Sequence, residues 1–371
     1  MKRLTIFISL VFIFVAAALV LVVYGMGYRL NWGERKIAGT GILSITSVPS
    51  GAAVYINEEL RGATDNSITN LPPGKYKVRL SKEGFSDWVK ELEVEKERVM
   101  PIEVYLFPSA PSLSALTFTG VISPNLSPDG QKIAYGIENN NNEGLWVLDF
   151  GTRQLIFSKS PQQIVKDTSS LRFSESSFVW ASDSRSILST LKDSSGKTKS
   201  FLLDSGRLNE TFDDVSTSSK DLQDQWKKDE DVKQTDRLSK LGEEAEKLSL
   251  GSSKLIFSPD EKRVLILKGK EDPLVYDSEP SIVPGSEAKT FKIPKALSYI
   301  WYPTTSKHIV LIKEDSISIV ESDGQNEMAI YTGEFGKEEV FPWSDGTRLV
   351  IATTLNTANS KKPNLYSISL K

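Results

Sequence analysis

Cysteine is absent from the 371-residue chain, and histidine occurs once, at His308. The missing thiols exclude disulfide frameworks, thiol nucleophiles, Cys-ligated zinc and a lipidated cysteine anchor. A single imidazole is too few for the histidine-rich sites that bind catalytic zinc. We therefore expect no metal site and no cofactor, and any membrane anchor has to be made of peptide.

An excess of charge of one sign is also missing. Lys and Arg number 45 against 48 Asp and Glu, and neither sign gathers into a long block. Nucleic-acid binding proteins usually concentrate positive charge on one face, so we expect no nucleic-acid partner. The length, once an anchor is set aside, predicts about two domains.

What the sequence does contain is one long apolar run near its start. Residues 4–23, LTIFISLVFIFVAAALVLVV, carry no charge. At 1.5 Å per residue, twenty helical residues cross the hydrocarbon core of a bilayer, which is about 30 Å thick. The run predicts a transmembrane helix over residues 4–24, with residues 1–3 on one side and a linker, residues 25–40, on the other.

A cleaved signal peptide is the alternative interpretation of this run. Signal peptides have a shorter apolar region that ends in small residues at a cleavage site. Here the small residues Ala16, Ala17 and Ala18 lie in the middle of the run and LVLVV comes after them. This arrangement favours an uncleaved anchor.

The charges on the two sides of the run give a weak signal for the orientation of the anchor. Lys2 and Arg3 precede the run, but Arg29, Arg35 and Lys36 lie beyond it, which weakens the positive-inside signal. A very short N-terminus left in the cytoplasm is the simpler topology. We expect a single-pass protein of the cell membrane with its N-terminus in the cytoplasm and its bulk outside.

Residues 41–107 alternate short apolar runs with turn residues, which predicts β-strands. Between residues 75 and 80, Tyr76, Val78 and Leu80 alternate with basic residues, so one face of that strand is expected to be buried. The turn before this strand is predicted at Pro72, Pro73 and Gly74.

This segment resembles the PEGA domain, a small β-sandwich of bacterial and archaeal surface proteins. The residues that carry the resemblance are Pro49, Gly51, Ala52, Val54, Tyr55, Ile56, Arg61, Gly62, Leu71, Pro73, Gly74, Tyr76, Gly84 and Phe85. One departure is Asp65 after Thr64, where the family often has proline, so the turn there is expected to differ. The resemblance implies an extracytoplasmic module and no catalysis.

Residues 108–371 contain five imperfect copies of one pattern, in which a large apolar residue and a turn precede a β-branched run. The copies are LSPDGQKIAY from Leu126, WASDSRSILS from Trp180, FSPDEKRVLI from Phe257, WYPTTSKHIVLI from Trp301 and WSDGTRLVIA from Trp343. Each copy predicts a hairpin, and most copies have a further strand after them.

The copies start 54, 77, 44 and 42 residues apart, and the last two spacings match the length of a four-stranded propeller blade. The two longer spacings are interpreted as containing insertions. The region resembles the TolB and WD40-like propeller repeats, mainly through the SPDG turns of the first and third copies. The fold class is therefore predicted to be mainly β: an N-terminal helix, a small β-sandwich and a β-propeller of about five blades. Because the last copy lacks an outer strand, we expect residues 113–119 to pair with residues 364–370 and close the ring.

One stretch, residues 213–249, interrupts this pattern with 18 charged residues. Leu238, Leu241, Ala245 and Leu248 recur at helical spacing, and Leu222 and Trp226 fit an earlier helix. The sequence predicts a helical insertion between the second and third blades. It either packs on its own propeller or serves as a docking arm for a partner.

The remaining candidate site residues recur at repeat positions. Asp129, Asp183, Asp260 and Asp345 all lie in predicted turns, which favours turn-making over catalysis. Trp180, Trp301 and Trp343 are interpreted as packing between blades, with stacking on a sugar or peptide as the alternative. No catalytic motif stands out, and a structural role is expected for His308.

The sequence as a whole indicates a non-catalytic, membrane-anchored binding or scaffold protein of the cell envelope, with an envelope protein or a cell-wall glycan as its partner. The candidate interaction residues are Trp226, Leu238, Leu241, Leu248, Trp180, Trp301 and Trp343. Two alternatives remain open. One is a propeller-borne lyase, hydrolase or peptidase accessory domain, and the other is a purely structural surface-layer component.

Overall fold

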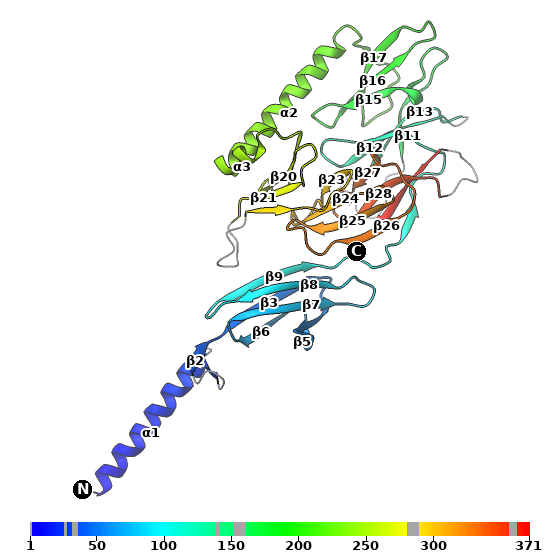
Figure 1. The fold of residues 1–371 in the computed structure, drawn as a ribbon. Helices are drawn as coiled ribbons and strands as arrows, with labels where there is room; N and C mark the ends of the chain where they lie inside the picture. Colours follow the sequence, from blue (N-terminus) through cyan, green and yellow to red (C-terminus); the bar gives the residue numbers. More distant parts are fainter. Residues whose placement is uncertain are drawn as a thin grey trace. The chain divides into compact units, whose positions relative to one another are not determined.

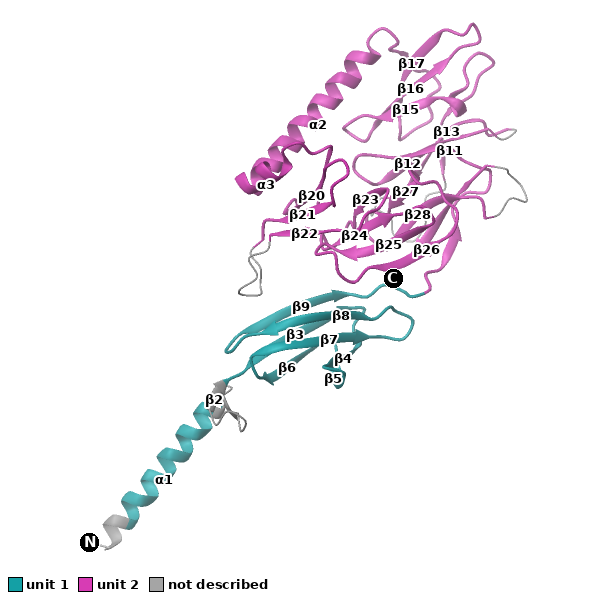
Figure 2. Ribbon diagram, in the orientation of Figure 1, with its two compact units in different colours: residues 1–109, 280–288 teal, residues 110–279, 289–371 magenta. Residues whose placement is uncertain are grey.

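The computed structural model describes most of the chain and divides it into two compact units (Figures 1 and 2). The described residues are 2–25, 28–31, 36–138, 141–150, 161–279, 289–355 and 362–371. The first unit comprises residues 1–109, and the second comprises residues 110–279 with 289–371.

The first unit begins with helix α1, Lys2–Gly25. It is the one helix in the described part of the chain that is long and apolar enough to cross a membrane, and the protein buries none of its window Ile6–Val23. Its 24 residues make a helix of about 36 Å. Within the predicted linker, β1 (Tyr28–Asn31) pairs with β2 (Lys36–Gly39), while residues 26, 27 and 32–35 lie outside the described residues.

Seven further strands of the first unit form a three-stranded sheet, β6-β3-β9, and a four-stranded sheet, β5-β4-β7-β8. Their bounds are β3 (Gly41–Val48), β4 (Ala53–Ile56), β5 (Glu59–Ala63), β6 (Asn66–Leu71), β7 (Gly74–Ser81), β8 (Trp88–Val94) and β9 (Val99–Tyr105). Side chains from both sheets, such as Leu43, Val54 and Trp88, form one buried core. Two sheets that share a core in this way make a β-sandwich.

The alternation predicted for residues 75–80 is confirmed in β7. Val78 and Leu80 are fully buried and Tyr76 packs partly against the same core, whereas Lys75 and Lys77 are exposed. The period of two residues places every second side chain on the same face of a strand.

The departure at Asp65 also has a structural consequence. The Asp65 carboxylate accepts a hydrogen bond from the Ser47 N–H at 3.0 Å, and the Thr64 hydroxyl accepts one from the Ala52 N–H at 2.9 Å. These two side chains tie the turn after β5 to β3 and to the residue before β4.

The described residues of the second unit form five four-stranded antiparallel sheets. The first sheet is β11 (Ile122–Leu126), β12 (Lys132–Ile137), β13 (Gly144–Asp149) and β14 (Gln162–Lys166). The second is β15 (Ser177–Trp180), β16 (Ser186–Lys192), β17 (Thr198–Asp204) and β18 (Asp213–Asp214), preceded by the short 3-10 helix η1 (Phe173–Glu175).

The third sheet is β19 (Lys254–Phe257), β20 (Arg263–Leu267), β21 (Leu274–Asp277) and β22 (Thr290–Lys292). The fourth is β23 (Ser298–Trp301), β24 (His308–Ile312), β25 (Ser316–Glu321) and β26 (Met328–Thr332). The fifth is β27 (Val340–Pro342), β28 (Arg348–Thr353) and β29 (Asn364–Ser369), with β10 (Leu113–Ala115) as its fourth strand.

The expected pairing of the segment that starts at residue 113 with residues 364–370 is confirmed by β10 and β29, although β10 is shorter than the predicted 113–119. Closure of the ring stays a prediction. Leu113 is opposite Ile368 and Ala115 is opposite Tyr366. Asn364 extends the connection, because its side-chain oxygen accepts hydrogen bonds from the Gly120 N–H at 2.9 Å and the Thr117 hydroxyl at 3.3 Å. The first strand and the last strand of the second unit are therefore joined in one sheet.

Apolar side chains pack between neighbouring sheets. One cluster joins the fifth sheet to the first, another joins the first to the second, and a third joins the third to the fourth. The fourth and fifth sheets are linked by a hydrogen bond from the Tyr302 hydroxyl to the Gly346 carbonyl. The sheets are thus adjacent to each other in the order third, fourth, fifth, first and second.

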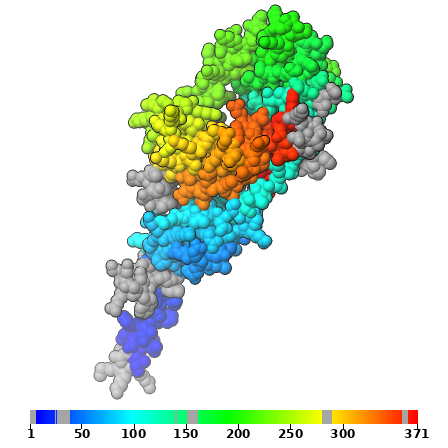
Figure 3. All heavy atoms as spheres, turned by 45° about the vertical axis from the view of Figure 1, so that its right-hand side comes forward, coloured from blue at the N-terminus to red at the C-terminus, as the bar shows by residue number. Residues whose placement is uncertain are grey.

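The remaining face of the third sheet is covered by helices. The insertion forms α2 (Ser219–Leu241) and α3 (Glu243–Ser249), and Val264, Ile266 and Tyr276 of the third sheet share a core with them. In the space-filling view the yellow-green helical residues lie against the yellow third sheet (Figure 3). The predicted start of the insertion at residue 213 is wrong, because Asp213–Asp214 form β18 and pair with β17.

The pairing of β10 with β29 gives a first testable prediction. Asn364 is buried, so Asn364→Ala leaves the Gly120 N–H without its acceptor and should cost about 1–3 kcal/mol. Hydrogen–deuterium exchange of the full chain should become faster in peptides that cover residues 113–121 and 364–370. Ser369→Ala, which removes a hydroxyl that bonds only to the nearby Lys371 carbonyl, is the matched control. Unchanged exchange in Asn364→Ala would show that this contact does not hold β10 on β29.

Candidate functional site: turns, helices and hollows of the second unit

The repeated turns are built by side chains that bond to the backbone. In the first copy the Ser127 hydroxyl donates to the Asp129 carboxylate at 2.6 Å, and the same carboxylate accepts the Gln131 N–H at 3.1 Å. The third copy repeats the first of these contacts between Ser258 and Asp260 at 2.6 Å. An aspartate that accepts the N–H two residues later forms the local turn typical of this residue type.

The other copies use the same arrangement with some substitutions. Asp183 accepts the Arg185 N–H at 2.8 Å, and Asp345 accepts the Thr347 N–H at 2.8 Å. In the fourth copy, which lacks the aspartate, the Thr305 hydroxyl accepts the equivalent bond at 3.2 Å. The interpretation of these aspartates as turn-makers is confirmed.

The turns also connect one sheet to the next. The Asp129 N–H donates to the Ser184 hydroxyl at 3.0 Å, which joins the first sheet to the second. The Asp260 N–H donates to the Ser306 hydroxyl at 3.1 Å, which joins the third sheet to the fourth in the same way. The SPD turns therefore position whole sheets as well as their own hairpins.

Sequence reasoning did not identify Arg263, a buried arginine at the start of β20 in the third sheet. Arg263 is only 6% exposed and donates to Asp277 at 2.8 Å and to Glu279 at 2.9 Å. A buried cation needs such partners to offset its lost hydration. The basic residue of the repeat is a visible signal, but its carboxylate partners come from another strand and loop.

Trp180 and Trp301 are buried, with 6% and 5% of their surface exposed. Each indole N–H donates to a carbonyl of the preceding sheet: Trp180 to Asn125 at 3.2 Å and Trp301 to Ile256 at 2.7 Å. Buried tryptophans usually find such a partner for the N–H. The burial of both rings favours packing between sheets over stacking on a ligand.

Trp343 does not share the repeat position of the other two, and that part of the expectation is wrong. Trp180 is opposite Ile187 in its hairpin, but the equivalent residue of the fifth sheet is Pro342, opposite Leu349. A shift of one residue moves a side chain to the other face of a strand. Trp343 is half-buried, and its ring centroid lies 4.6 Å from that of Phe150.

The candidate residues of the helical insertion divide into two groups. Leu241 is buried with the third sheet, and Leu238 and Leu248 pack partly against the same core. Trp226 is half-exposed and lies about three turns earlier in α2. Residues 227–233 between these regions are exposed on every side of the helix. The end of the insertion thus packs on its own sheet, and the middle of α2 is open to solvent.

A hollow of about 350 Å³, called here the α2 hollow, lies where α2 meets the first strands of the third and fourth sheets. Its lining includes Arg237, Phe257, Glu261, Ile300 and Trp301. Arg237 forms an ion pair with Glu261 at 2.8 Å and lies 6.0 Å from the centre of the Phe257 ring. The α2 hollow thus combines mainly apolar lining residues with one fixed pair of charges.

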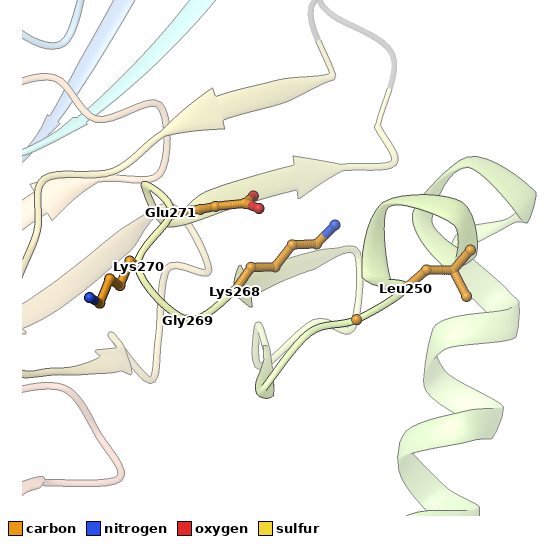
Figure 4. A pocket seen from close by; sticks show the side chains of 6 residues that line it. Leu250, Lys268, Gly269, Lys270 and Glu271 are labelled. Carbon is orange, nitrogen blue, oxygen red and sulfur yellow. The ribbon is translucent and has the colours of Figure 1, made fainter.

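A second, shallow hollow adjoins the end of α3 (Figure 4). Lys268 and Glu271 extend to the same side of their loop, whereas Lys270 points away from the helix (Figure 4). Leu250 borders it from the helical side and is 74% exposed. These side chains offer charges of both signs.

The outer face of the four-stranded sheet in the first unit carries an aromatic and a cation in contact. The Arg79 guanidinium lies 3.8 Å from the centre of the Tyr55 ring, and the same side chain reaches Glu58 at 3.3 Å. Arg79 therefore covers one face of this ring. Both strands that carry these residues belong to the sandwich described above.

Residues 40–109 match the PEGA domain. The match covers both sheets of the sandwich, so the resemblance inferred from the sequence is confirmed for this part of the chain. No curated protein is similar to this sequence.

Among solved structures, TolB from Acinetobacter baumannii is 12% identical, with a TM-score of 0.23; the match covers 86% of this chain and 64% of that one. Oligogalacturonate lyase from Vibrio parahaemolyticus is 11% identical, with a TM-score of 0.27 and coverage of 90% and 98%. The β-propeller domain of the Trilobed protease from Pyrococcus furiosus is 14% identical, with a TM-score of 0.20 and coverage of 90% and 85%. The chain spans less than two thirds of the length of the first of these proteins.

Groups that resemble catalytic or metal-binding residues have structural surroundings. The described residues contain no cluster of three or more potential metal ligands. His308 is buried, and its Nδ1 lies 2.9 Å from the Thr305 hydroxyl in the turn before β24.

Glu339, just before β27, is half-buried, and burial together with the nearby Glu338 raises the pKa of its carboxyl group. Sequence reasoning did not identify Glu339, because its burial depends on how residues 336–339 pack beside Ala352 of β28.

The helical insertion gives a second prediction. Leu241→Ala should destabilise the contact between α2 and the third sheet by about 2–5 kcal/mol, because a buried leucine leaves a cavity. Val232→Ala on the exposed middle of α2 is the matched control, since Val232 is 69% exposed. Limited proteolysis should cleave α2 and α3 faster in Leu241→Ala alone. Equal cleavage of the two variants would contradict the packing described here.

The raised pKa of Glu339 gives a third prediction. A carboxyl whose pKa is higher in the folded state favours folding when protonated, and this contribution is lost as the pH rises through the folded pKa. Glu339→Gln should therefore be more stable than the unchanged protein at pH 7.5 and lose this advantage near pH 4, as measured by urea unfolding. Glu271→Gln, which changes an exposed carboxyl, is the control. A stabilisation of equal size by Glu339→Gln at both pH values would contradict this prediction.

Proposed function

We propose that the protein is a non-catalytic binding protein of the cell envelope, anchored by α1 with its N-terminus in the cytoplasm. The PEGA domain and the second unit then lie outside the cytoplasm. The five sheets act as the blades of a β-propeller, with α2 and α3 inserted between the second and third blades. The function is to hold a rigid binding surface close to the membrane for an envelope protein or glycan.

The observation that carries this proposal is the exposed apolar surface of α1. The large side chains from Ile6 to Val23 are 36–77% exposed, and the rest of the described chain leaves the helix uncovered. Exposing this much contiguous apolar surface to water is unfavourable, whereas a bilayer supplies an apolar solvent over the same length. The PEGA match supports an extracytoplasmic position for the residues beyond α1.

Binding is favoured over catalysis by the roles of the polar residues. The repeated aspartates are occupied in turns, the buried Arg263 is satisfied by its carboxylate partners, and the α2 hollow is mainly apolar. A ligand site is commonly a concave, largely apolar surface with a few placed polar groups. The α2 hollow and the exposed middle of α2 are the parts of the second unit that fit a protein partner best.

The topology is the property to test, and the absence of cysteine makes the test specific. Single cysteines are introduced at Lys96→Cys, on the exposed surface of the PEGA domain, and between Met1 and Lys2. A membrane-impermeant maleimide applied to intact cells or spheroplasts should label Lys96→Cys directly. It should label the N-terminal cysteine only after the membrane is permeabilised, and carbonate washing should leave the protein in the membrane fraction.

Two outcomes would refute the proposed function. Labelling of Lys96→Cys only after permeabilisation would place the bulk of the protein in the cytoplasm. Recovery of a soluble protein that has lost the N-terminal cysteine would identify α1 as a cleaved signal peptide. The unmodified chain, which has no thiol, controls for non-specific labelling.

A further inference from the structure

A third hollow lies at the turn end of the first and second sheets, away from the α2 hollow. It has a volume of about 510 Å³, within the range of roughly 300–1,000 Å³ typical of small-ligand sites. Its walls come from the turn between β15 and β16, the loop between β17 and β18, and Lys132 at the start of β12. We call it the β17–β18 hollow.

One side of this hollow is rigid because its polar groups are already satisfied. The Asn209 side chain is 8% exposed and donates to the Ile164 carbonyl at 2.9 Å and the Asp204 carbonyl at 2.8 Å. Lys132 donates to the Ser205 hydroxyl at 3.1 Å. These contacts fix the loop from 204 to 213 before any ligand arrives, which lowers the entropic cost of binding.

The other side presents polar groups that have no protein partner. Arg185, Thr211 and Asp213 line the hollow and are exposed, and within the described part of the chain their side chains form no hydrogen bond or ion pair with the protein. Three donor and acceptor groups from two different segments thus face one space. They are free to bond to a ligand without breaking a contact of the protein.

The charge of the lining is balanced. The cations Lys132, Arg185 and Arg207 are matched by three aspartates, at positions 183, 204 and 213. A polyanion would meet the three carboxylates, and a polycation would meet the three basic groups. A neutral ligand avoids both repulsions, and its specificity has to come from hydrogen bonds.

Hydroxyl groups suit this mixture best. A hydroxyl both donates and accepts, so it can satisfy a carboxylate and a guanidinium at the same site. Phe212 adds an apolar wall: it is half-buried, and its ring packs edge-on against Phe173 and Phe201 at centroid distances of 5.1 and 5.0 Å. A sugar combines hydroxyl groups with an apolar ring face, which matches the two kinds of lining.

We propose that the β17–β18 hollow binds a neutral glycan, through Arg185, Thr211 and Asp213. This inference deepens the proposed function and rests on it, because cell-wall glycans are within reach only if the second unit lies outside the cytoplasm. It also names a site that none of the sequence-derived candidate interaction residues line. The binding step involves no covalent chemistry.

The test uses the full chain in a detergent without a sugar headgroup. The probes are neutral oligosaccharides, namely β-1,4-linked N-acetylglucosamine, cello- and malto-oligosaccharides, with oligogalacturonate as the anionic comparison. Isothermal titration calorimetry should detect binding of at least one neutral probe. Because no net charge is exchanged, the affinity should stay within about twofold between roughly 50 and 300 mM salt.

Substitutions in the hollow and on α2 test whether the oligosaccharide binds at this site or elsewhere on the surface. Arg185→Ala and Asp213→Ala should each weaken binding by about tenfold, which corresponds to the loss of about one hydrogen bond to a charged group. Arg185→Lys keeps the charge but loses the planar pair of donors, so it should weaken binding as well. Lys220→Ala and Asp224→Ala, exposed on α2, are the controls and should bind as the unchanged protein does. The unfolding temperature of each variant checks that it is folded.

Three results would overturn the inference: no neutral oligosaccharide binds, Arg185→Ala and Asp213→Ala bind as well as the controls, or oligogalacturonate binds more tightly than every neutral probe. Each of these leaves the proposed anchored topology unaffected. An inverted or soluble protein in the cysteine-labelling experiment, by contrast, would refute the proposed function whatever the hollow binds in vitro.

Discussion

Most sheets of the second unit have two apolar faces, and both have to be kept from water. Strands such as β24 and β28 are buried along nearly their whole length, which is possible only if another element covers each side. For most faces the cover is a neighbouring sheet. For the third sheet one cover is the fourth sheet and the other is the pair α2 and α3. The helical insertion is therefore part of the core of this unit.

The same constraint explains the polar groups between the sheets. Side chains that sit between two sheets have to satisfy their donors there, and the indoles of Trp180 and Trp301 do so on carbonyls of the preceding sheet. The hydroxyls of Ser184 and Ser306 accept backbone N–H groups from the turn of the neighbouring sheet. Packing and hydrogen bonding thus fix the same interfaces, and this rigidity lets the hollows between sheets keep their shape.

The two units meet different physical requirements. The PEGA domain buries one core between two sheets, and its outer faces carry exposed charges such as Lys75 and Lys77. Helix α1 is apolar on all sides and uncovered by the rest of the described chain, so its stability depends on an apolar solvent. The glycan-binding hollow that we propose on the second unit and the membrane anchor that we propose on the first would together let the protein hold a wall polymer near the membrane.

Much of the candidate site could not be predicted from the sequence, because it depends on contacts between separate segments of the chain. The turn roles of Asp129 and Asp183 were predictable because an aspartate bonds to the N–H two residues away, and such a contact is local. The free groups of the β17–β18 hollow come from two segments that are separate in the sequence, and nothing in either segment indicates the other. The offset of Trp343 was visible in the sequence but overlooked: Trp343 lies two residues before Asp345, whereas Trp180 lies three residues before Asp183.

The sequence by itself determined the apolar helix, the PEGA sandwich, the hairpins of the repeats and the helical character of residues 219–249, since each depends on patterns within one or two elements. Only the tertiary structure decided which face of the third sheet the helices cover, that β10 is the outer strand of the last sheet, and which polar groups of the β17–β18 hollow remain unpaired. Those features depend on contacts between residues far apart in the chain, such as Thr117 with Leu365, and local periodicity carries no information about such pairs.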